Sequence, residues 1–127
     1  MPEKMILVVD DEEELLELIS DTLSAQGYEV TTGVTAEEAV NKAKALIPDL
    51  LLIDIILPDM EGPEAVRILS ENPATSNIPT IFLSGIITRD NDENATTEVR
   101  VGGRLYTALS KPFSSQELMV EVRKAIG

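Results

Sequence analysis

Five polar side chains in this sequence each come at or directly after the end of an apolar run, and they could share one chemical task. They are Asp10, Asp11, Asp54, Ser84 and Lys111. Each has an ordinary explanation by itself, because Asp often caps a helix, Ser often ends a strand and Lys is usually a solvated surface residue. Their repeated position at the ends of apolar runs instead predicts that they converge in one site.

The chemistry that this set predicts is phosphoryl transfer. Three clustered carboxylates repel one another unless a cation neutralises them, and oxygen ligands favour Mg²⁺, with Mn²⁺ as an alternative. A carboxylate beside such a cation can act as a nucleophile toward phosphorus, and Asp54 is the candidate. Lys111 and Ser84 could then stabilise the charge on the phosphoryl oxygens.

The elements that must position these residues alternate along the chain. Apolar, β-branched runs predict strands at residues 5–9, 28–33, 50–54, 79–84 and 105–110. Helical spacing and capping signatures predict helices that end near Gly27, near Leu46, near Ser70 and at the end of the chain. Residues 88–104 are polar with no clear helical period, so any helix there should be short or loosely held. This order predicts an α/β fold with a doubly wound, five-stranded parallel sheet.

Composition limits the other classes of function. The 127 residues are expected to form one domain, 1–127, without a linker or an output domain. The absence of Cys and His excludes thiolate and histidine metal sites and a catalytic histidine. A formal net charge of −13 makes direct binding to nucleic acid or anionic membranes unfavourable. No apolar run approaches the length of a membrane span, and a cytoplasmic location is expected.

Four motifs carry a resemblance to a known family over essentially the whole chain. They are Val8-Val9-Asp10-Asp11-Glu12, Leu52-Ile53-Asp54-Ile55-Ile56-Leu57-Pro58-Asp59-Met60-Glu61-Gly62, Phe82-Leu83-Ser84-Gly85 and Ser110-Lys111-Pro112-Phe113. In this order they resemble the receiver domains of two-component response regulators. The resemblance implies the flavodoxin-like strand order 2-1-3-4-5 in a (βα)5 fold.

The resemblance also implies roles for individual residues. Asp54 would be the phosphoacceptor, Asp11 a direct Mg²⁺ ligand, Asp10 a contributor through water, and the backbone carbonyl of Ile56 a further ligand. Ser84 would move toward the phosphoryl group on activation, and the peptide bond before Pro112 would be cis.

The implied partners are proteins. The phosphoryl donor would be a phosphohistidine on a sensor histidine kinase or a phosphotransfer protein, and the target an unidentified downstream protein or linked output domain. A phosphorylation-dependent homodimer is one form of output. The chain would catalyse only its own slow phosphorylation and dephosphorylation, not a reaction on an external substrate.

Three features depart from the family's usual pattern. Ala108 stands where an aromatic residue is usual, and Tyr106 lies two residues earlier on the same strand face, so whether it replaces that aromatic is open. Residues 88–104 occupy the place of the output helix, and we expect them to be mobile in the unphosphorylated protein. Ile56 and Ile86 are apolar at positions that flank the path of attacking water, which predicts a long-lived phosphoryl group.

Two other functions compete with this interpretation. A metal-dependent phosphatase or phosphotransferase could use Asp54 on small molecules, but the chain has no room for a substrate cap, and Ile56 stands where a second acid would be expected. A receiver-like scaffold that is never phosphorylated would be expected to lose one of the acidic or basic site residues. The presence of all of them favours the phosphorylated module.

Overall fold

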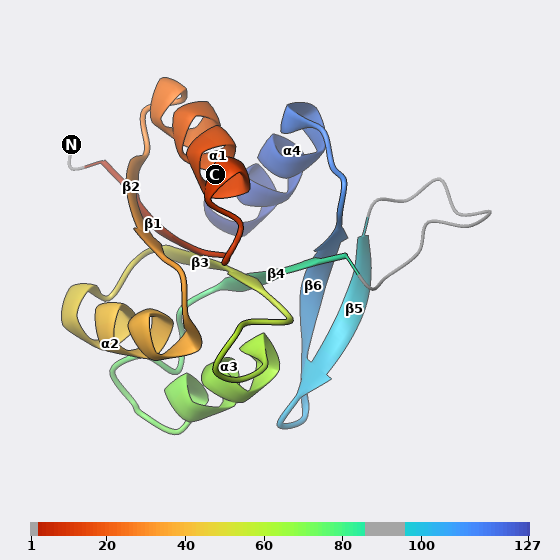
Figure 1. Cartoon of the computed structure of the whole chain (residues 1–127). Coiled ribbons are helices and arrows are strands. Elements are labelled where there is room, and N and C mark those ends of the chain that lie inside the picture. The colour runs from red at the N-terminus through yellow and green to blue at the C-terminus, as the bar shows by residue number, and fades with distance from the viewer. Residues whose placement is uncertain (1–2, 86–95) are drawn as a thin grey trace.

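The computed structural model describes residues 3–85 and 96–127, which form one mixed β-sheet with helices on both faces (Figure 1). The strands of the described residues are β1 Met5–Val9, β2 Glu29–Gly33, β3 Leu50–Asp54, β4 Thr80–Ser84, β5 Thr96–Val101 and β6 Arg104–Ser110. The helices are α1 Glu13–Ala25, α2 Ala36–Leu46, α3 Gly62–Ser70 and α4 Ser115–Ile126. None of these helices is both long and apolar enough to cross a lipid bilayer.

The order of strands across the sheet is β2-β1-β3-β4-β6-β5. The first five of these strands are parallel, and their order matches the predicted 2-1-3-4-5 arrangement, with β6 in the place of the predicted fifth strand. Strands β1, β3 and β4 are almost wholly buried, as expected for parallel strands covered on both faces. The predicted α/β class and doubly wound topology are therefore confirmed.

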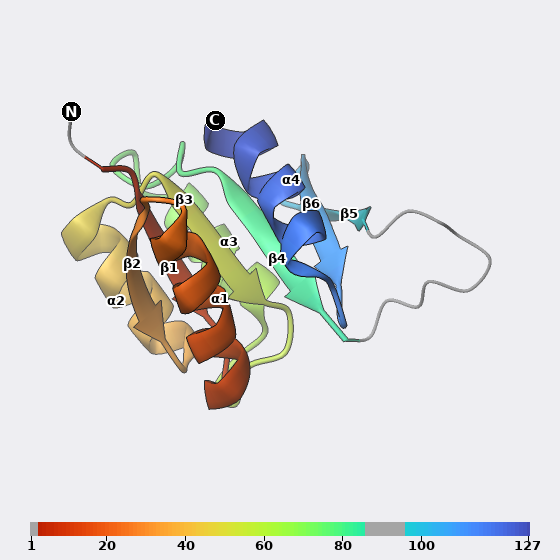
Figure 2. The same cartoon turned by 90° about the horizontal axis from the view of Figure 1, so that it is seen from above.

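Helices α1 and α4 lie on one face of the sheet and α2 and α3 on the other (Figure 1 and Figure 2), and a hydrophobic core fills the space on each side. Alternate residues of the central strands point to opposite faces, so Ile6 and Val8 pack toward α1 and α4 whereas Leu7 and Val9 pack toward α2 and α3. Each helix contributes an apolar stripe, for example Leu16, Ile19 and Leu23 of α1. This packing fixes the strand ends on which the polar residues stand.

One crossover differs from the predicted (βα)5 arrangement. Residues 96–101, where any helix was expected to be short or loosely held, form β5, an added edge strand that pairs antiparallel with β6. A tight turn at Gly102 and Gly103 joins the two strands, and both glycines have positive φ, as a two-residue hairpin turn requires. Residues 96–104 thus form a paired hairpin, residues 88–95 lie outside the described part of the chain, and the mobility of residues 88–104 in the unphosphorylated protein stays a prediction.

The hairpin is held against α3 by its side chains. Val101 is buried and Val99 and Tyr106 are half-buried in the core on the α2 and α3 side of the sheet. The rings of Tyr106 and Phe82 meet edge to face, with centroids 5.8 Å apart. Near the turn, Arg104 donates a 2.6 Å hydrogen bond to the backbone carbonyl of Ser76. The hairpin thus contributes side chains to the core on the α2 and α3 side of the sheet.

Candidate functional site

The carboxyl ends of four parallel strands bring the predicted polar residues to one edge of the sheet. Asp10 directly follows β1, Asp54 and Ser84 end β3 and β4, and Lys111 directly follows β6. The strand register places Asp54 beside Leu83, and Ser84 beside Ser110. The predicted convergence at one edge is observed in the structure, because strands that run parallel end on the same side of the sheet.

The Lys111 ammonium is at the centre of this cluster. Its Nζ atom lies 2.7 Å from Asp10 Oδ2, 2.9 Å from Asp54 Oδ2 and 3.1 Å from Glu12 Oε1. Burial lowers the pKa of Lys111, but its close contacts with the three carboxylates outweigh burial, so the net pKa is raised. Lys111 therefore remains a cation throughout the neutral range and sits directly against the proposed acceptor carboxylate.

Asp10 is fully buried beneath the ammonium. Its Oδ1 accepts a 2.9 Å hydrogen bond from the backbone N–H of Glu12, while Oδ2 forms no hydrogen bond of normal geometry with the described residues and faces the Lys111 charge. Burial raises the pKa of Asp10, and the contact with the Lys111 ammonium opposes that change. A buried oxygen with only an ion-pair contact is well suited to a second cation or to a water bound to one.

Asp54 is oriented by the contacts that its two carboxylate oxygens make. The backbone N–H of Ile56 donates to Oδ1 at 3.1 Å, and Lys111 Nζ contacts Oδ2 at 2.9 Å. The residue is 7 % exposed, which leaves it reachable from a cavity of about 240 Å³. That cavity is lined by Asp11, Glu12, Asp54, Ile56, Ser84, Gly85 and Lys111. It is several times larger than the ~30 Å³ that one molecule of liquid water occupies.

The donor set of the cavity fits a hard divalent cation. Carboxylate oxygens of Asp10, Glu12 and Asp54 lie within 4.8 Å of one another. Oxygen ligands of this kind suit Mg²⁺ or Mn²⁺. Glu12 was not predicted as a candidate ligand, although the run Asp10-Asp11-Glu12 contains it, and Asp11 lines the cavity without belonging to the three-carboxylate group.

Gly62 holds the loop between β3 and α3 against the site. Its N–H donates a 2.7 Å hydrogen bond to the carbonyl of Ile55, and a Cβ atom at this position would lie 2.1 Å from the backbone oxygen of Asp54. Only glycine permits so close an approach. Sequence reasoning missed this role of Gly62. The signal that could have indicated it is a glycine directly before Pro63, at the start of a helix.

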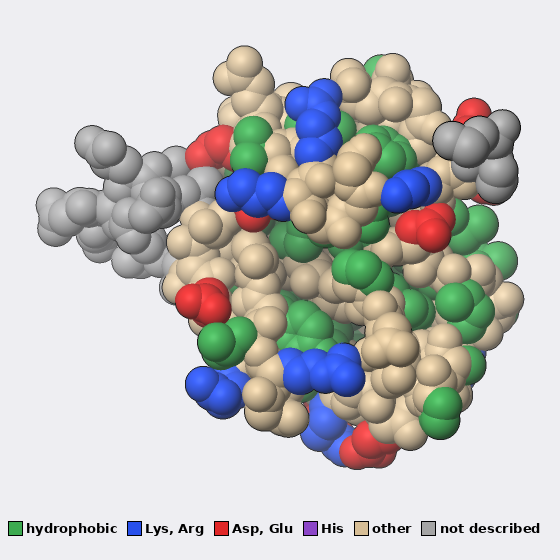
Figure 3. All heavy atoms as spheres, turned by 180° about the vertical axis from the view of Figure 1, so that it is seen from behind, with side chains coloured by type: hydrophobic (Ala, Val, Ile, Leu, Met, Phe, Trp, Pro, Cys, Tyr) green, Lys and Arg blue, Asp and Glu red, His purple; other side chains and the backbone are tan. Residues whose placement is uncertain are grey.

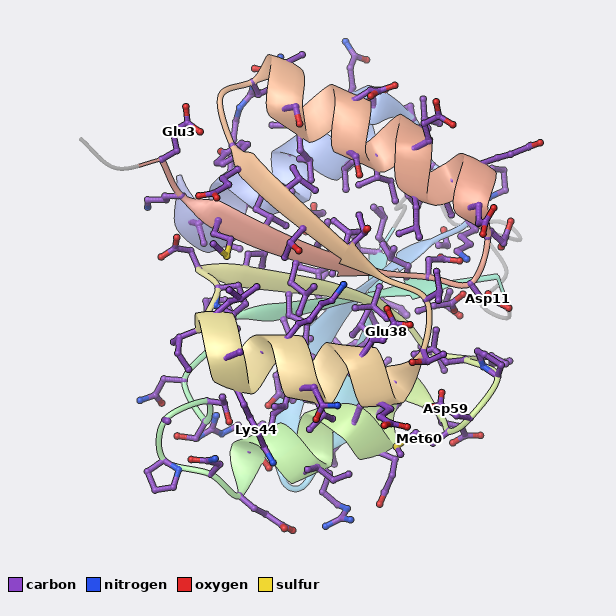
Figure 4. All side chains as sticks on the ribbon, turned by 60° about the vertical axis from the view of Figure 1, so that its left-hand side comes forward. Glu3, Asp11, Glu38, Lys44, Asp59 and Met60 are labelled. Atoms are coloured by element: carbon purple, nitrogen blue, oxygen red, sulfur yellow. The ribbon has the colours of Figure 1, made fainter. Side chains whose placement is uncertain are left out.

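Asp59 links the same loop to α2. Its Oδ1 and Oδ2 accept hydrogen bonds of 2.8 and 2.9 Å from the backbone N–H groups of Ala36 and Glu37, the first two residues of that helix. These hydrogen bonds, with that from Ala36 the strongest cause, lower the pKa of Asp59. Figure 4 shows Asp59 and Asp11 at the same end of the molecule, beyond the strand ends.

Nearly the whole chain matches one protein family. A family model described as the response regulator receiver domain matches residues 6–123 of the chain. The chain belongs to this family. As a receiver domain, it is a phosphoacceptor module of two-component systems and not a conventional enzyme.

Several known proteins are similar to this receiver domain. The phosphate regulon transcriptional regulatory protein PhoB of Rhizobium meliloti is 36% identical over 118 residues, which are 93% of this chain and 50% of PhoB. The polar-differentiation response regulator DivK of Brucella ovis is 29% identical over 124 residues, 98% of this chain and 97% of DivK. The chain thus spans about half the length of PhoB but nearly all of DivK.

Solved structures share the fold. Chemotaxis response regulator CheY4 of Vibrio cholerae has a TM-score of 0.82 and 26% identity, with 98% of this chain and 100% of CheY4 covered. The receiver domain of sensor histidine kinase PA1611 from Pseudomonas aeruginosa PAO1 has a TM-score of 0.81 and 27% identity, with 99% of both chains covered. That structure contains a magnesium ion coordinated in its active site cleft.

The structure of this receiver domain shows one feature that the family pattern implies and three of the residues that depart from that pattern. The peptide bond between Lys111 and Pro112 is cis, as predicted. Ala108 is buried beside Phe82, and the Tyr106 ring packs edge to face on Phe82. Tyr106 is therefore part of the core on the α3 side. Ile56 is 53 % exposed at the cavity, whereas Ile86 lies outside the described residues.

Proposed function

We propose that this receiver domain accepts a phosphoryl group on Asp54 and thereby switches a protein-interaction surface. The single observation that carries the proposal is the contact of 2.9 Å between Lys111 Nζ and Asp54 Oδ2 beside an open cavity. A fixed cation next to a nearly buried, reachable carboxylate stabilises the charge that develops on a transferred phosphoryl group.

In the proposed reaction a carboxylate oxygen of Asp54 attacks phosphorus and forms the P–O bond of an acyl phosphate. The bond from phosphorus to the leaving group breaks, and the leaving group keeps the electron pair. Lys111 then pairs with a phosphoryl oxygen, and Ser84, which lines the same cavity, donates a hydrogen bond to another. Hydrolysis of the acyl phosphate by water would return the carboxylate.

A divalent cation, Mg²⁺ or Mn²⁺, is part of the proposal. Asp10, Asp11 and the backbone carbonyl of Ile56 would hold it with Asp54, and Glu12 is an additional candidate because its oxygen approaches those of Asp10 and Asp54. When bound, the cation would neutralise charge on the phosphoryl oxygens. Support comes from the three convergent carboxylates and from the magnesium ion in the similar histidine kinase receiver domain.

The proposed phosphoryl donor is a phosphohistidine on a sensor histidine kinase or phosphotransfer protein. The proposed output is a contact with another protein or a linked domain, in a single domain of residues 1–127 acting in the cytoplasm. The net charge of −13 favours protein partners over nucleic acid. The face in Figure 3 mixes basic, acidic and hydrophobic side chains and presents no continuous basic patch.

Incubation with acetyl phosphate and Mg²⁺, followed by intact mass measurement, tests the proposal. We expect one phosphoryl adduct on the natural chain and none on Asp54→Ala. Asp21→Asn is the matched control, because Asp21 is an exposed carboxylate of α1. It should behave like the natural chain. An adduct of equal yield on Asp54→Ala would show that another group is the acceptor, and no adduct on any chain would favour an unphosphorylated scaffold.

A further inference from the structure

Strand β5 is the outer edge of the sheet in the described part of the chain (Figure 1). Val101 and Arg104 flank a two-residue turn and therefore form a hydrogen-bonded pair in the hairpin. Such pairs alternate along an antiparallel ladder, so the backbone groups of Val101, Val99 and Thr97 point toward β6. Those of Arg100, Glu98 and Thr96 then point away from the sheet, toward a further strand.

The side chains on this edge alternate between the two faces. Val99 and Val101 pack toward α3, while Glu98 and Arg100 are exposed on the opposite face. Neither Glu98 nor Arg100 has an ion-pair partner among the described residues, and the two are separated by two positions. A strand with one acidic and one basic residue on the same face is complementary to an antiparallel copy of itself.

We propose that the outer edge of β5 pairs antiparallel with β5 of a second copy of this chain, with the two-fold axis at Val99. Glu98 then lies opposite Arg100 of the second copy, and Arg100 lies opposite its Glu98, which gives two charge pairs per dimer. Because the backbone groups of both residues point outward, each of these pairs also exchanges two backbone hydrogen bonds.

Other registers are less favourable. A shift by one residue would place outward backbone groups opposite inward ones and would move every side chain to the wrong face. Centring the pair on Glu98 keeps the hydrogen bonds but places two glutamates directly opposite each other, which is repulsive. The register centred on Val99 also brings Val99 beside its own copy, on the face that packs toward α3. This proposal does not depend on phosphorylation of Asp54.

Disulfide trapping tests the register, because the chain contains no cysteine. Val99 and its copy would form a non-hydrogen-bonded pair with Cα atoms about 4.5 Å apart, a separation that a disulfide can span. We expect Val99→Cys to form a disulfide dimer under mild oxidation. Thr97→Cys should not, because the two copies of residue 97 would be four residues apart along the strands. Equal trapping at both positions, or trapping only of Glu98→Cys, would overturn the proposed register.

Charge exchange tests the complementarity. At an ionic strength of ~0.15 M, which limits repulsion between the acidic chains, sedimentation velocity should show dimerisation of the natural chain. Glu98→Arg should weaken it by about tenfold, and the double variant Glu98→Arg/Arg100→Glu should restore it. Glu29→Arg, on the opposite edge strand, makes the same change in net charge and should leave dimerisation intact. A natural chain that stays monomeric up to near-millimolar concentration, or a double variant that stays as weak as Glu98→Arg, would refute the proposal.

Discussion

The close approach of Gly62 to Asp54 predicts an unusual response to a single added methyl group. In Gly62→Ala the new Cβ would lie 2.1 Å from the backbone oxygen of Asp54 and 3.1 Å from its carbonyl carbon. Real Cβ atoms essentially never come within 3.0 Å of another heavy atom. The loop or the end of β3 must therefore move by about 1 Å, which displaces the acceptor carboxylate.

The expected change in stability follows from two opposing effects. Overpacking of a tight contact costs about 1–3 kcal/mol, whereas Gly→Ala at an unstrained site stabilises by about 0.4–1 kcal/mol through the unfolded chain. With an unfolding entropy of about 2.1 cal/mol/K per residue over 127 residues, the overpacking cost of about 1–3 kcal/mol corresponds to a fall in Tm of roughly 4–11 °C. The smaller stabilisation through the unfolded chain reduces this fall.

Thermal unfolding followed by circular dichroism measures this effect. Gly85→Ala is the control, because a Cβ at Gly85 would meet nothing within 4 Å and its φ is not positive. We expect Gly62→Ala to lower Tm and to slow phosphoryl capture from acetyl phosphate, with Tm of Gly85→Ala unchanged or slightly raised. A Tm for Gly62→Ala equal to or above that of the natural chain would refute the steric argument.

Three further predictions concern the loop and the site. Asp59→Ala should lower the free energy of unfolding by up to about 1 kcal/mol, because the first two N–H groups of α2 lose the exposed carboxylate to which they donate hydrogen bonds. Because the pKa of Asp59 is lowered in the folded protein, its contribution to stability is complete above the ordinary Asp pKa of 3.8 and is lost as the pH falls through the folded pKa. The difference in Tm between Asp59→Ala and the natural chain should therefore vanish in acid. Lys111→Met should bind Mg²⁺ several-fold more tightly in calorimetry, because the ammonium no longer competes with the cation for the Asp54 carboxylate. The variant should still capture phosphoryl groups poorly, because it lacks the charge that stabilises the transferred group. An unchanged Mg²⁺ affinity would contradict the competition. Phosphorylated protein should have a half-life in Mg²⁺ well beyond seconds, and Ile56→Asn should shorten it; a natural half-life of seconds would reject the prediction.

Much of the fold was predictable because local pattern and tertiary burial agree. The observed bounds of β1 and β3 are the predicted ones, since an apolar run of about five residues between polar ends is too short for a helix and suits a strand buried on both faces. The predicted capping box of α4 is observed at Ser114 and Glu117. The convergence of Asp10, Asp54 and Lys111 then follows from parallel topology alone.

The hairpin was missed although its signal is present. Thr97, Val99 and Val101 alternate with polar residues, and Gly102 and Gly103 follow directly, which is the pattern of a strand that enters a two-residue turn. Residues 88–95 carry no such alternation, so the short period-two signal is lost when it is averaged over residues 88–104. Glu12 and Gly62 were missed for another reason, because only the folded loops reveal which oxygens converge and where a Cβ would collide.

Identification of the modified residue tests the central claim most directly. Borohydride reduction converts an aspartyl phosphate into homoserine, so reduction after treatment with acetyl phosphate and Mg²⁺, followed by digestion and tandem mass spectrometry, locates the acceptor. We expect homoserine at position 54, and none when Mg²⁺ or acetyl phosphate is left out. Homoserine at position 10 or 11 with Asp54 unchanged, or no homoserine in a chain that carries the phosphoryl adduct, would contradict it.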